Sequence, residues 1–137
     1  MEAAKRIGRW LLFLPGALVA SILAGGLVKL FCRYTDMFGA FDPDTWFGRA
    51  TTEATSGAVI GAAFVYAGAA IAPTHRQRVC FGLAALGLVI TGAGLLANLV
   101  VSNYWGVWQG VFIGFGAAAV AYSTHEGELF PIPPRQP

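Results

Sequence analysis

The chain has 137 residues, of which 56% are hydrophobic and 12% are charged, and its net charge is +2. Because soluble domains carry about 25% charged residues, this chain has too few polar side chains to cover a water-soluble surface, and its composition favours a membrane protein. No basic stretch alternates with aromatic residues, so the sequence predicts no nucleic-acid partner.

Four apolar segments are each long enough to cross about 30 Å of hydrocarbon as a helix that rises about 1.5 Å per residue. They lie at about residues 10–31, 50–72, 79–101 and 104–122. Helices satisfy their backbone hydrogen bonds internally, as a spanning segment must. The sequence therefore predicts an all-α integral membrane protein, in which residues 1–137 form a single membrane domain folded as a four-transmembrane-helix bundle.

The first segment follows a basic stretch, as the apolar core of a signal peptide does. Its apolar run continues to Phe31, which is longer than a signal core requires, so we expect a retained span. The connection at 32–49 alternates aromatic and acidic residues, and we expect a short interfacial segment there, with its rings at headgroup depth. Next, Thr51-Thr52-Glu53 resembles a helix start, with a hydroxyl cap and an acid in the first turn.

The basic residues are unevenly distributed between the two sides of the predicted bundle. The side with both termini carries Lys5, Arg6, Arg9, Arg76, Arg78 and Arg135, and the other carries Lys29, Arg33 and Arg49. The positive-inside rule then predicts an N-in/C-in topology in the inner (plasma) membrane of a bacterium-like cell. The proline-rich tail at 123–137 would be cytoplasmic.

Small residues recur at four-residue intervals in two of the predicted spans. The second span carries Gly57 and Gly61, and the fourth carries Gly106, Gly110, Gly114 and Ala118. In lipid, helices associate through close van der Waals contact, which small side chains permit. We therefore expect helix-packing surfaces here. The helix that each surface contacts belongs either to the same chain or to another one.

Polar residues within the spans are sparse. The predicted midpoints hold Ser21 and Thr91 but no titratable group, which argues against a proton-coupled transporter. Near one membrane surface, four polar residues fall at similar depth: Lys29, Glu53, Asn98 and Gln109. If they turn inward together, Lys29 and Glu53 pair, and the two amides complete a polar cup open to the outside. In the interpretation that we favour, the lysine extends to the surface, Glu53 caps its helix, and the two amides hydrogen-bond to neighbouring helices.

At the opposite surface, His75, Arg76 and Arg78 are candidates for contact with anionic lipid headgroups. The spacing of His75, Cys80 and His125 matches no metal-ligand motif, so the sequence predicts no metal site. Cys32 and Cys80 fall at opposite ends of the bundle, too far apart for a disulfide.

The sequence contains no motif that indicates catalysis or a cofactor. We therefore expect a small non-enzymatic membrane protein, either an accessory subunit of a membrane complex or a homo-oligomer that associates through its small-residue faces. The alternative is a small channel or transporter that admits a polar solute through the polar cup. In both cases we expect the protein to be embedded in the lipid bilayer.

Overall fold

The computed structural model describes residues 2–37, 39, 42, 44–72 and 75–129, with side chains from Leu12 onward. It consists of four helices, which are α1 (Glu2–Asp36), α2 (Trp46–Ile71), α3 (Arg76–Val100) and α4 (Tyr104–His125). Each helix is long and apolar enough to cross a membrane. The described residues contain no strand. The predicted four-helix membrane fold is thus confirmed.

Helix boundaries extend beyond the predicted spans. α1 continues to Asp36 and α4 to His125, whereas the sequence placed the ends at residues 31 and 122. α2 already begins at Trp46, so helix occupies both ends of the connection expected at 32–49. The physical reason is that hydropathy marks the hydrocarbon layer, while a helix can continue through the interfacial region on either side of it.

The predicted start of α2 at Thr51-Thr52-Glu53 is wrong. The N-cap is Thr45, whose Oγ1 accepts a hydrogen bond from the Gly48 amide at 3.1 Å. Thr51 lies inside the helix, where its Oγ1 donates to the Phe47 carbonyl at 2.9 Å. Threonine is equally suited to capping at position 45 or 51. The turn that begins at Asp42 leads the chain directly into a helix at Thr45.

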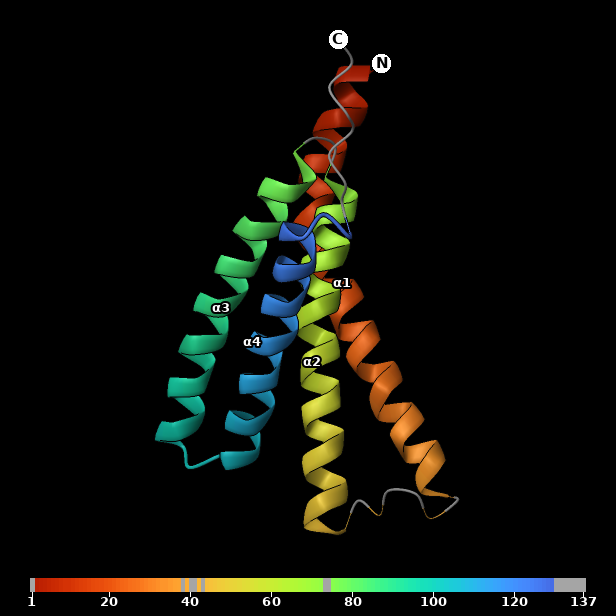
Figure 1. Ribbon diagram of the computed structural model, residues 1–137, viewed down its shortest axis with the longest axis vertical. Helices are drawn as coiled ribbons and strands as arrows, with labels where there is room; N and C mark the ends of the chain where they lie inside the picture. The colour runs from red at the N-terminus through yellow and green to blue at the C-terminus, as the bar shows by residue number, and fades with distance from the viewer. Residues whose placement is uncertain (1, 38, 40–41, 43, 73–74, 130–137) are drawn as a thin grey trace.

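The four helices converge at one end and separate at the other (Figure 1). We call the first the closed end, where α2 and α4 finish and α3 begins, and the second the open end, which holds the α3–α4 hairpin. α2 packs against all three other helices, and α4 also packs against α3. Among the described residues, α1 makes no close backbone contact with α3 or α4. The backbones of α1 and α3, at the two edges of the bundle, therefore do not meet.

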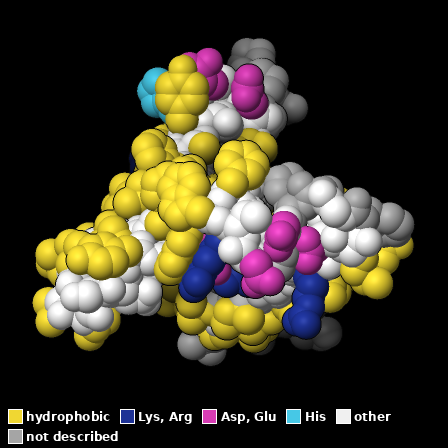
Figure 2. All heavy atoms as spheres, turned by 90° about the horizontal axis from the view of Figure 1, so that it is seen from below, with side chains coloured by type: hydrophobic (Ala, Val, Ile, Leu, Met, Phe, Trp, Pro, Cys, Tyr) yellow, Lys and Arg dark blue, Asp and Glu magenta, His cyan; other side chains and the backbone are white. Residues whose placement is uncertain are grey.

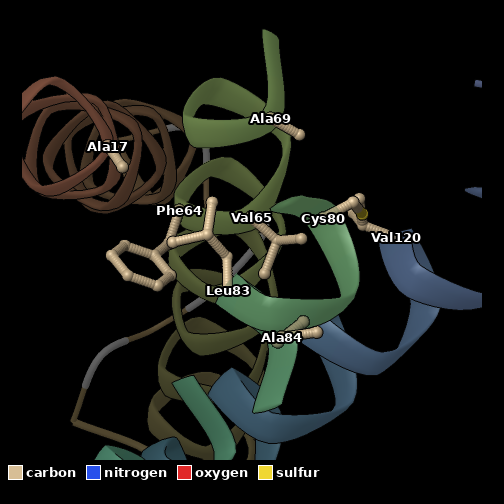
Figure 3. Close-up of a cluster of buried hydrophobic side chains, with 9 residues drawn as sticks. Ala17, Phe64, Val65, Ala69, Cys80, Leu83, Ala84 and Val120 are labelled. Carbon is tan, nitrogen blue, oxygen red and sulfur yellow. The ribbon is translucent and has the colours of Figure 1, made fainter. Parts of the chain in front are cut away.

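The buried core lies toward the closed end (Figure 3). Its members, most of them small, are Ala17, Phe64, Val65, Ala69, Cys80, Leu83, Ala84, Ala117 and Val120. A Cβ atom added at Gly68 would collide with the Leu83 side chain and lie 3.2 Å from the Cβ of Ala17. Since these residues belong to α3 and α1, three helices meet at this glycine.

α2 and α4 cross in backbone contact. A Cβ atom added at Gly57 would lie 2.5 Å from the carbonyl oxygen of Gln109. One at Gly61 would collide with the Ile113 carbonyl, and one at Gly116 with the Ala58 carbonyl. Because the obstacles are backbone atoms of the facing helix, a side chain at these sites would require the two helices to move apart.

The α3–α4 hairpin is closed by a tight helix-ending turn. The Asn103 amide donates to the Asn98 carbonyl at 2.8 Å, and the Ser102 amide donates to the Leu99 carbonyl at 3.1 Å. This is the Schellman pattern, which places Ser102 in the left-handed region at φ 54°. The Asn103 side chain then caps α4 by accepting from the Gly106 amide at 3.2 Å.

Candidate functional site

The glycines expected to form packing surfaces all contact helices of the same chain. Gly57 and Gly61 face α4, as described above. A Cβ atom at Gly106 would collide with the Asn98 side chain, whereas one at Gly110 or Gly114 would lie 2.8 Å from Leu95 or 3.4 Å from Leu88. Gly106, Gly110 and Gly114 therefore face α3 and not the glycines of α2.

Ala118 does not continue this surface, because its side chain is exposed. A helix turns about 100° per residue, so four-residue steps drift by about 40° each and reach about 120° over three steps. Gly116, which the sequence analysis missed, instead provides the closest approach to α2. Gly116 lies seven residues, or about two helical turns, after Gln109, so both lie on the side of α4 that faces α2.

The predicted polar cup divides into two groups. Lys29 Nζ lies 3.2 Å from Glu53 Oε2, with side chains 47% and 21% exposed, and this ion pair links α1 to α2. Glu53 lies well inside α2, so it does not cap the helix as the favoured interpretation required. Asn98 and Gln109 lie elsewhere, in the lining of a cavity to which neither member of the ion pair belongs.

That cavity has a volume of about 450 Å³ and all four helices contribute to it. Its position follows from the fold, because the backbones of α1 and α3 do not meet. The cavity lies between these two helices, and α2 and α4 complete its lining. The lining is mostly apolar, with Leu18, Ile60, Phe64, Ile90, Leu95 and Ile113 among its members. Its polar residues are Ser21, Thr91, Asn98, Asn103 and Gln109.

The ion pair lies beyond this cavity, toward the open end. Ser21, Gly25 and Lys29 follow one another at four-residue steps on one face of α1. On α2, Glu53 precedes the cavity-lining Ile60 by seven residues, or about two helical turns, on the same face. Figure 2 looks onto the open end, where acidic and basic side chains lie beside one another within a hydrophobic surface.

Aromatic side chains also join the helices at the open end. Trp108 Nε1 donates a hydrogen bond to the Ala50 carbonyl at 2.9 Å, and the Trp108 ring lies 5.0 Å from that of Phe112. The Arg49 guanidinium lies 4.7 Å above the Trp105 ring, in cation–π geometry. These tryptophans were not predicted from the sequence as contact residues, although indole rings at the ends of a span are typical interfacial residues.

The residues expected to contact lipid headgroups lie exposed at the closed end, where α3 begins. His75 precedes the helix with a left-handed backbone at φ 52°, and Arg76 and Arg78 occupy its first turn. Among the described residues, no three His, Cys, Asp or Glu side chains are grouped so that they could hold a metal. Cys32 and Cys80 are both free thiols, located in α1 and α3 respectively.

Comparison of the chain with protein-family models, with curated proteins and with solved structures found no match. The class of the protein is therefore defined by its own fold, which is that of a small multi-pass membrane protein with four apolar helices.

Proposed function

We propose that this protein is a non-enzymatic accessory subunit that assembles with a membrane protein, or with further copies of itself, through the outer face of α3. We place it in the inner membrane with both termini in the cytoplasm. The uneven distribution of lysine and arginine supports this orientation, because α3 begins with Arg76 and Arg78 at the end where α4 finishes.

The observation that carries the proposal is an uncovered face of α3 that includes small residues. Within the described chain only three of its residues are buried, namely Cys80, Leu83 and Ala84. The opposite side of the helix carries Gly82, Ala85, Val89, Gly92 and Leu96. Val89 is 71% exposed, and a Cβ atom added at Gly82 or Gly92 would meet nothing within 4 Å.

A face of this composition permits close approach of a second helix in lipid. The glycines of α2 and α4 that also suggested association are occupied by contacts within the chain. The outer face of α3 is thus the small-residue surface that we assign to a partner.

The double variant Gly82→Leu, Gly92→Leu tests the proposal. It adds bulk where no atom of the chain lies nearby, so the fold should persist, and protection of the buried Cys80 from a maleimide verifies this. We expect native gels and cross-linking in mild detergent to show loss of the larger assembly. Gly26→Leu, at an equally open position on α1, should retain that assembly. If the double variant has an unchanged assembly state, the proposed interface is wrong.

The channel alternative gains no comparable support. The structure separates the Lys29–Glu53 ion pair from the amides of the expected cup, and the cavity that holds the amides is mostly apolar.

A further inference from the structure

We propose that the cavity between α1 and α3 binds the hydrocarbon chain of an uncharged lipid, whose head carries hydroxyl or carbonyl groups in the manner of a monoacylglycerol. This site is separate from the outer face of α3 and does not depend on the function proposed above.

The volume of the cavity, about 450 Å³, suits a small ligand. It falls within the range of about 300–1,000 Å³ found for small-molecule sites. On α3 the lining runs from Gly87 to Asn98, a length of about 16 Å, which makes the site elongated.

The polarity of the lining changes along this length. Toward the closed end the cavity is bounded by Leu18, Phe64 and Gly87, and toward the open end by Asn98, Asn103 and Gln109. A ligand that matches this gradient has an apolar chain pointing to the closed end and a polar group near the α3–α4 hairpin. A lipid has an apolar chain and a polar head, and it can enter the cavity from the bilayer between α1 and α3.

Two hydrogen-bonding side chains in the cavity are available to such a head. Within the described residues, the Gln109 carboxamide and the Thr91 hydroxyl make no hydrogen bond, although both line the cavity. Asn98 differs, because its Nδ2 donates to the Gly94 carbonyl at 2.9 Å and its Oδ1 accepts from Asn103 at 2.8 Å. Polar groups in an apolar medium are stabilised by a hydrogen-bond partner, which a hydroxyl or ester carbonyl supplies.

Charge excludes an ionic head inside the cavity. No lining residue is charged, and Lys29 and Glu53 beyond its open end neutralise each other at 3.2 Å. An ionised group moved from water into this site would lose hydration without gaining a counter-charge. The uncharged Gln109 carboxamide, which both donates and accepts, suits a hydroxyl or ester group instead.

Photolabelling of the full chain in nanodiscs tests the site. The probe is a monoacylglycerol with a diazirine on its chain, and we expect labelled peptides from the segments around Phe64 and Ile90. Gly94→Leu fills the cavity from a position whose Cβ meets no atom within 4 Å, and should reduce labelling at least tenfold. Gly82→Leu, on the same helix but outside the cavity, should leave labelling unchanged. Cys80 protection verifies that each variant is folded.

Competition tests the choice of head. Unlabelled monoacylglycerol should displace the probe more effectively than an alkane of equal chain length or an anionic phosphatidylglycerol. Monoacylglycerol should displace the probe at a lower concentration than the alkane does. Gln109→Leu should reduce this difference in concentration about three- to tenfold, which is the effect of one lost hydrogen bond. Labelling that survives Gly94→Leu overturns the site, and equal displacement by phosphatidylglycerol overturns the assignment of an uncharged head. Because Gly82 belongs to the proposed α3 interface, a Gly82→Leu variant that loses assembly but keeps labelling separates the two proposals.

Discussion

The indole of Trp108 donates a hydrogen bond to the carbonyl oxygen of Ala50 over 2.9 Å, and so connects α4 to α2 at the open end. The buried core lies toward the other end of these helices, and this bond joins them beyond it, beside the cation–π contact of Arg49 with Trp105. The Phe112 ring, 5.0 Å from Trp108, packs beside the indole from the next turn of α4.

Trp108→Phe should therefore reduce stability without changing the fold. Phenylalanine retains an aromatic ring beside Phe112 but cannot donate to Ala50, so we expect a loss of about 1–2 kcal/mol in the free energy of unfolding. Unfolding by a denaturing detergent measures this change. Trp46→Phe is the matched control, because Trp46 is 71% exposed. Equal effects of the two substitutions would show that the Ala50 bond contributes nothing.

Glycine-to-alanine substitutions should have opposite signs at two positions. At Gly116 the added methyl group collides with the Ala58 backbone, so Gly116→Ala should cost about 3 kcal/mol as α2 and α4 move apart. At Gly82 the methyl group meets nothing, and the higher helix propensity of alanine should stabilise by up to about 1 kcal/mol. The unfolding free energies of the two variants in detergent provide the test. A tolerated Gly116→Ala would contradict the close crossing of α2 and α4.

The Lys29–Glu53 ion pair should contribute little to stability. Its side chains are 47% and 21% exposed within the chain, and at the membrane surface, where we place them, water screens the attraction. In a double-mutant cycle with Lys29→Met and Glu53→Gln, we expect a coupling energy below about 1 kcal/mol that weakens further with added salt. A coupling of several kcal/mol, insensitive to salt, would mean that the pair is buried by lipid or by a partner.

Ser102 occupies a backbone conformation that favours glycine, with φ at 54°. Ser102→Gly should therefore stabilise the α3–α4 hairpin by about 1 kcal/mol, since the left-handed conformation costs a residue with a Cβ about that amount. Ser102→Ala keeps the Cβ and should give no such gain. The free energy of unfolding of the two variants distinguishes them, and a similar value for both would argue against the left-handed turn.

The number of helices and their membrane character could be predicted because both depend on local composition. Long apolar runs such as 79–101 indicate a span whatever surrounds them. Helix ends were harder to locate, since Thr45 and Thr51 are both competent caps and only the preceding turn selects Thr45. The extension of α1 to Asp36 lies beyond the apolar run that marked its predicted end.

Helix pairing could not be derived from the sequence in the same way. Spacing identified Gly106, Gly110 and Gly114 as a surface but did not indicate that it faces α3. Glu53 and Gln109 have similar predicted depth, which suggested that they belong to one cup. Depth gives the position of a residue along its helix but not the direction in which the helix turns that residue. The cavity arises from the separation of α1 and α3, which is a property of the whole bundle.

The concentration of the core toward the closed end has a consequence for how the protein opens. Ala69, Cys80 and Val120 are sequestered there, whereas Trp46, Val100 and Tyr104 at the opposite end are largely exposed. Partial unfolding should therefore start at the hairpin and at the beginning of α2, while the segment around Val65 keeps its amide protons longest against exchange with solvent deuterium. Because stability decreases toward the open end, the residues around the open end of the cavity would fluctuate while the four helices stay packed at the closed end.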